Sequence, residues 1–148
     1  MQKILFGLLM LFSISAFAAD KSYFENEKGA VNGYDVVAYF TQSAPVKGDK
    51  KFHYQWKNNN WYFSSAENLA KFQQSPEKYA PQYGGFCAFA AANDALAPTV
   101  PEAWTIVDGK LYLNYSLNVK KKWSKKIPEF ISEANENWAG LSKKVANY

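Results

Sequence analysis

The sequence predicts an α+β fold in which antiparallel β-hairpins pack against several helices. Asp108-Gly109, between the apolar runs Trp104–Val107 and Lys110–Tyr115, is typical of a tight hairpin turn. From Val119 to Leu141 apolar residues recur every three or four positions, as they do on one face of a helix. The pattern therefore favours one small α+β domain, with antiparallel hairpins and helices packed on one side.

The first half of the chain contributes two further expected strands and a second hairpin. Val36–Phe40 is a mostly apolar run of strand length that follows a turn at Gly33-Tyr34-Asp35. Phe52–Trp56 alternates between apolar and polar residues, which places His53 and Gln55 on its polar face. Asn58–Asn60 tolerates positive φ, so we expect it to turn the chain into Trp61–Phe63.

Helix boundaries can also be predicted. Ser64 and Glu67 have the spacing of a capping box, so we expect a helix that buries Ala66, Leu69 and Phe72. Pro76 favours the first turn of a new helix. Phe86–Ala92 is small and apolar and is interpreted as helix. Pro128 interrupts the C-terminal apolar stripe and predicts two helices in series or one kinked helix, ending at Gly140.

The N-terminus has the composition of an export signal. Lys3 precedes an apolar run from Ile4 to Ile14, and Ala16-Phe17-Ala18 is typical of a cleavage site. We therefore expect residues 1–18 to be a signal peptide and the mature protein to be periplasmic, with no transmembrane segment. Residues 19–32 are polar and predict a mobile or loosely docked arm, followed by a domain over residues 33–148.

Composition excludes several functions. Loss of Lys3 with the signal peptide lowers the net charge from +4 to +3, and the basic residues are all lysine. Without arginine, bidentate recognition of phosphate is not expected, and a mild lysine excess indicates solubility rather than a nucleic-acid partner. The single cysteine, Cys87, excludes an internal disulfide. The remaining roles for Cys87 are a buried thiol, a metal ligand or one half of an intermolecular disulfide.

Several motifs resemble the YHS domain family in its exported bacterial form. They are Tyr34–Phe40, Trp61–Phe63 with Ser65, Pro76–Tyr79, Tyr83–Ala88 and Glu102–Tyr115. The resemblance extends from about Asn32 to Trp138 and implies a hairpin-helix core, with copper or zinc binding in the members that carry cysteines. At the positions of those cysteines this chain has Ala38, Ser64 and Asn68, none of which is a thiolate ligand.

Cys87 and His53 are therefore the remaining candidates for a soft metal. Cys87 follows Gly84-Gly85 at an expected helix start, where the helix dipole would favour a thiolate. His53 is the only histidine, and with Cys87 it could hold Cu(I) at low coordination, copper being the metal that the resemblance implies. The alternatives are a Cys87 that only packs in the core and a His53 that faces water.

Other functions remain open. No catalytic triad, nucleophile elbow or phosphate loop is present, so we expect a non-catalytic binding protein. Aromatic residues make up 18% of the chain and could line a pocket near Tyr83–Phe89 for a sugar, a tetrapyrrole or another small molecule, or for a protein partner, or they could simply fill the core. A thiol redox role for Cys87 alone is a further alternative. The lysines at 120–122, 125 and 126 form a solvated face or, alternatively, a contact with anionic lipid or an acidic partner.

Overall fold

The computed structural model describes residues 20–148, and the predicted signal peptide lies outside this range. Within it, the strands are β1 (Glu25–Asn26), β2 (Gly29–Ala30), β3 (Asp49–Trp56), β4 (Asn59–Phe63), β5 (Trp104–Val107) and β6 (Lys110–Leu113). The α-helices are α1 (Ala38–Thr41), α2 (Ala66–Gln74), α3 (Pro76–Tyr79), α4 (Ala88–Ala92), α5 (Leu117–Trp123) and α6 (Ile127–Leu141). Short 3-10 segments are η1 (Val31–Gly33), η2 (Gln82–Gly85) and η3 (Ser142–Asn147). The predicted α+β class is confirmed.

The strands of the described chain form three separate antiparallel hairpins. The turn between β5 and β6 is Asp108-Gly109, as predicted, and both residues have positive φ, at 50° and 73°. The turn between β3 and β4 lies at Lys57-Asn58, one residue before the predicted asparagine run. Asn59 instead begins β4 and is completely buried.

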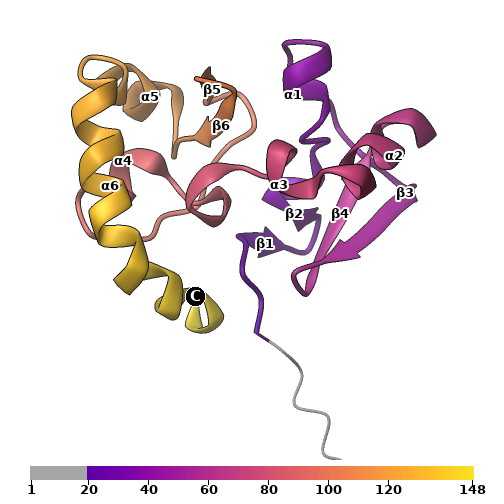
Figure 1. Ribbon diagram of the computed structural model, residues 1–148, viewed down its shortest axis with the longest axis horizontal. Helices are drawn as coiled ribbons and strands as arrows, with labels where there is room; N and C mark the ends of the chain where they lie inside the picture. Colours follow the sequence, from indigo (N-terminus) through magenta and orange to yellow (C-terminus); the bar gives the residue numbers. More distant parts are fainter. Residues whose placement is uncertain (1–19) are drawn as a thin grey trace, which may run out of the picture.

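In β3 the predicted alternation is confirmed. Phe52, Tyr54 and Trp56 are half-buried and belong to the edge of the core, whereas His53 and Gln55 are exposed. The inward face meets Phe72 of α2, whose ring centroid lies 5.6 Å from that of Trp56. This hairpin and helix lie in the half of the molecule drawn on the right in Figure 1, together with α1, α3, β1 and β2.

The segment 19–32 was expected to be a loose arm, and for the described residues this is wrong. Phe24 and Val31 are buried, and β1 and β2 pair with each other. The side chain of Asn59 holds the incoming chain: its Oδ1 accepts the amides of Ser22 and Tyr23 at 3.2 and 3.1 Å. The polar composition of the segment did not indicate that these few apolar residues would be buried. Asn59, which binds the amide of Tyr23, lies 36 residues further along the chain and could not be predicted as its partner.

The predicted strand over Val36–Phe40 is also wrong, because this segment turns into α1. The Asp35 carboxylate accepts the amides of Val37 and Ala38, at 2.9 and 3.2 Å, and so begins the helix. Tyr39 is buried, whereas Phe40 packs edge-on against Tyr79 with the ring centroids 5.3 Å apart.

The start of α2 differs from the predicted capping box by one residue. Ser65, not Ser64, is the N-cap, and its Oγ accepts the amide of Asn68 at 3.1 Å. Phe72 is buried as predicted, but Ala66 is exposed and Asn68 takes a buried place on the inner face. Ser64 was unavailable for capping because its side chain binds Asp35.

The C-terminal part contains two helices in series, as Pro128 predicted, with that proline in the first turn of α6. Trp123, Ala134 and Leu141 of the predicted stripe are fully buried. The helix continues one residue beyond Gly140 and passes into η3. Figure 1 shows α4, α5, α6 and the β5–β6 hairpin together in the left half. Leu96 and Trp138 pack against both hydrophobic clusters of the core, which makes the two halves one continuous structure.

Candidate functional site

Cys87 lies at the N-cap of α4 and is 1% exposed. Its amide donates to the carbonyl of Ala97 at 3.0 Å. Its Sγ accepts the amides of Ala90 and Tyr115, at 3.5 and 3.3 Å, and lies 3.5 Å from Oδ1 of Asn114. The sulfur is therefore enclosed by groups from the second half of the chain.

Burial raises the pKa of the Cys87 thiol, and the backbone hydrogen bonds from Ala90, Tyr115 and Phe89 offset this only in part. The prediction that the helix start would favour a thiolate is thus wrong in direction. A buried thiol whose pKa is raised stays protonated at neutral pH, which makes it a poor nucleophile and a poor metal ligand. The environment of Cys87 suits a packing role.

His53 lies elsewhere, exposed on β3, where it pairs across the hairpin with Tyr62. Figure 1 shows β3 and α4 in opposite halves of the molecule, so the structure does not bring His53 and Cys87 together. Within residues 20–148, no three His, Cys, Asp or Glu side chains are placed to share a metal ion. The side chains around Cys87 and His53 do not fit a copper site.

The structure does bring Ala38, Ser64 and Asn68 together, around the carboxylate of Asp35. Asp35 is 0% exposed, and its Oδ2 accepts the Ser64 amide at 2.8 Å, the Ser64 hydroxyl at 2.6 Å and Nδ2 of Asn68 at 2.8 Å. With the amides of Val37 and Ala38 on Oδ1, both oxygens are saturated by protein donors. This cluster is a hydrogen-bonded junction and offers no lone pairs to a metal.

Sequence reasoning missed Asp35, although a signal for it was present. An aspartate directly before a short apolar run is a common helix N-cap. The hydrogen-bond partners of its second carboxylate oxygen could not be predicted from the sequence, because Ser64 and Asn68 lie 29 and 33 residues away.

A groove of about 560 Å³ with aromatic walls lies between the two halves. We call it the aromatic groove. Its rings come in two pairs: Tyr23 with Trp56, whose centroids are 5.5 Å apart, and Tyr83 with Trp138, at 5.8 Å. Its polar and small lining residues include Asp20, Lys21, Ser22, Lys57, Glu77, Gln82, Ser142 and Lys143.

One wall of the groove is built on an unusual backbone. Tyr83, Gly84 and Gly85 have positive φ in succession, at 54°, 61° and 76°. Glycine is needed at the latter two positions, because a Cβ on Gly84 would lie 2.8 Å from the Ser22 carbonyl and one on Gly85 2.4 Å from Val31 Cγ1. For Tyr83 the conformation is strained, and strain of this kind gathers at functional sites.

Hydrogen bonds and packing hold Tyr83 in that conformation. Its hydroxyl lies 3.0 Å from Oδ1 of Asn135 and 3.3 Å from the carbonyl of Ile131, both on α6. Burial, together with the nearby Tyr112, raises the pKa of Tyr83 far above its ordinary value, so the hydroxyl remains a donor. Tyr83 therefore ties η2 to the helix that carries Trp138.

The electrostatics of the groove are mixed. Burial, followed by the charge of Glu77, raises the pKa of Tyr23 to about 12, so this phenol stays neutral. Lys21 is drawn to Glu25, with Nζ 2.7 Å from the carboxylate, and Lys57 lies 5.7 Å from the centre of the Trp56 ring. Since charges of both signs line it, the groove is suited to a neutral polar molecule.

The predicted aromatic pocket near Tyr83–Phe89 coincides with this groove only at its start. Tyr83 and Gly84 line the groove, whereas Phe89 faces Phe130 at 5.2 Å. Local sequence could not predict that Trp56 and Tyr23 line the same groove, since Trp56 belongs to β3 and Tyr23 lies in the chain before β1.

Comparisons of the chain with models of known families, with curated proteins and with solved structures gave no match. Among residues 20–148, no helix has both the length and the apolar character required to cross a membrane.

Proposed function

We propose that this protein is an exported, periplasmic, YHS-like binding protein that holds a small, flat, neutral and polar molecule, of the sugar class, in the aromatic groove without catalysis. The observation that carries the proposal is the meeting of two aromatic pairs, Tyr23–Trp56 and Tyr83–Trp138, in one groove. A volume of about 560 Å³ lies within the range of small-molecule sites.

Aromatic faces and hydrogen-bonding groups together suit a sugar. Trp56 and Trp138 are half-buried and so retain exposed ring surface. Apolar faces of a sugar ring stack on such surfaces, while side chains such as Gln82 and Ser142 can bond its hydroxyl groups. A strongly charged ligand is disfavoured, because Lys143 and Glu77 both line the groove and oppose one another.

The test is a fluorescence titration of the mature protein with a panel of monosaccharides and disaccharides. We expect saturable quenching, and about tenfold weaker binding in Trp138→Phe, since loss of the larger ring surface removes about 1.4 kcal/mol. Trp104→Phe is the matched control, because Trp104 packs on Tyr39, with ring centroids 5.4 Å apart, and does not line the groove. Absence of saturable binding across the panel, or equal loss in both variants, would overturn the proposal.

The export component has a separate test. Mass spectrometry of the protein made from the full chain should show an N-terminus at Ala19, in a periplasmic fraction. An intact Met1 on cytoplasmic protein would refute export without bearing on the groove.

A further inference from the structure

The positive charge of this protein is concentrated on one helix and the turn after it. We call this the basic surface; it consists of Lys120, Lys121, Lys122, Lys125 and Lys126. No acidic residue occurs between Asp108 and Glu129. The other residues in the range 20–148 contain eleven lysines against thirteen acidic residues, so the remainder of the protein is slightly negative.

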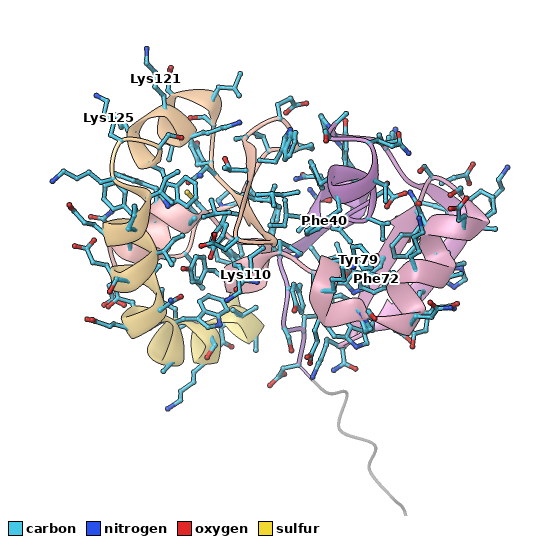
Figure 2. All side chains as sticks on the ribbon, turned by 45° about the horizontal axis from the view of Figure 1, so that its top comes forward. Phe40, Phe72, Tyr79, Lys110, Lys121 and Lys125 are labelled. Atoms are coloured by element: carbon cyan, nitrogen blue, oxygen red, sulfur yellow. The ribbon has the colours of Figure 1, made fainter. Side chains whose placement is uncertain are left out.

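Helix α5 holds these lysines outward. Trp123 is 0% exposed and anchors the inner face, with its ring 5.4 Å from that of Tyr112. The lysines at 121, 122 and 125 are exposed, and Figure 2 shows Lys121 and Lys125 projecting from the same end of the molecule. Among described residues, the basic surface has one ion pair, between Lys126 and Glu129 at 3.2 Å.

An exposed apolar side chain, that of Leu117, adjoins the lysines. Leu117 is 60% exposed, and in the described range only Tyr115 and Tyr148 are comparably exposed large hydrophobic residues. Leu117 opens α5, and Lys121 lies four residues later, on the same helical face. An exposed leucine beside a row of cations is suited to an interface that is both anionic and apolar.

We propose that the basic surface docks on an anionic phospholipid membrane, with the lysines at the headgroups and Leu117 at the acyl boundary. Each lysine near such a surface contributes about 1 kcal/mol, or about fivefold in binding. Charge complementarity selects the anionic membrane, and Leu117 distinguishes it from a purely acidic polymer, which would gain nothing from an exposed leucine.

This inference is independent of the proposed ligand. Figure 1 shows α5 at the opposite end of the left half from the C-terminal segment, and residues of that segment, Ser142 and Lys143, line the aromatic groove. Docking through α5 therefore leaves the groove open to solvent, and the protein would present it away from the lipid surface.

The experiment is co-sedimentation of the mature protein with vesicles of phosphatidylcholine alone, and with about 30% phosphatidylglycerol added to supply surface charge. We expect binding only to the anionic vesicles, and its loss in about 0.5 M salt, which screens the lysines. Lys121→Gln with Lys125→Gln should weaken binding about thirtyfold, and Leu117→Ser about tenfold. The matched control, Lys28→Gln with Lys50→Gln, changes the charge equally on exposed residues outside the basic surface and should alter binding less than about twofold.

Several results would overturn the proposal: no binding of the wild type to anionic vesicles, equal binding to neutral ones, or equal loss in the control. Binding that is insensitive to Leu117→Ser and is reproduced on heparin would indicate an acidic polymer and refute the membrane. Because all substituted residues are exposed, the circular dichroism spectra of the variants should match that of the wild type.

Discussion

Replacing Asp35 by asparagine should destabilise the protein severely. Five donors converge on this carboxylate: three on Oδ2, from Ser64 and Asn68, and two on Oδ1, from Val37 and Ala38. Asparagine has one acceptor oxygen, and its NH₂ group must face the donors on the other side. If the NH₂ group replaces Oδ2, the Ser64 hydroxyl and a flipped Asn68 amide can both accept from it, and only the Ser64 N–H loses its acceptor. If it replaces Oδ1, the buried amides of Val37 and Ala38 both lose theirs, so one or two N–H groups are left without an acceptor.

The magnitude follows from that count. A buried donor left unsatisfied costs about 1–3 kcal/mol, so Asp35→Asn should lower the free energy of unfolding by about 1–6 kcal/mol. For a domain of this size that corresponds to a decrease in Tm of roughly 4–25 °C. Ser64→Ala should cost less, about 1–2 kcal/mol, because Asp35 keeps four of its donors.

The assay is urea unfolding of the mature protein, followed by tryptophan fluorescence. The matched control is Asp49→Asn, because Asp49 also accepts a backbone amide, that of Lys51 at 2.9 Å, but is exposed to water. We expect the control to change stability by less than about 0.5 kcal/mol. A loss in Asp35→Asn no larger than in the control would show that the junction does not stabilise the fold, and the reasoning would fail.

Two further predictions concern titratable groups. Cys87 should react with a thiol reagent at neutral pH roughly 100-fold more slowly in the native protein than in denaturant, because modification requires local opening of a buried site whose thiol pKa is raised; equal rates would show an accessible thiol. Burial raises the pKa of Glu25, but hydrogen bonds from Lys21, Asn60 and Asn59 outweigh it, and the folded pKa lies below the ordinary value of 4.5. The stabilisation is then complete above pH 4.5 and is lost as the pH falls through the folded pKa, so the Tm of Glu25→Gln measured against pH should fall less steeply in acid than that of the wild type. Parallel curves would contradict this.

Local signals were sufficient for much of the fold. Asp108-Gly109 specified its hairpin, since two residues with positive φ define a tight turn regardless of context. Pro128 separated α5 from α6, because proline lacks the amide that a continuous helix requires. The alternation of β3 placed His53 on the exposed face and Trp56 on the face toward the core. The burial of Cys87, by contrast, could not be decided from the sequence, which left a metal ligand and a packing residue both open.

What the sequence alone determined about this protein is therefore its class, its main hairpins and the helical stripe, all properties set within a few residues by backbone geometry. Only the tertiary structure decided the rest. Val36–Phe40 turns into α1 because Asp35 accepts the amides of Val37 and Ala38 while bonding to Ser64 and Asn68. The segment before Asn32 became ordered because Asn59 binds its backbone. The aromatic groove likewise joins Tyr23 and Trp56 to Tyr83 and Trp138. Each of these features depends on residues tens of positions apart in the sequence. A local sequence pattern cannot predict which distant group will accept a hydrogen bond from a buried donor or line the other side of a groove.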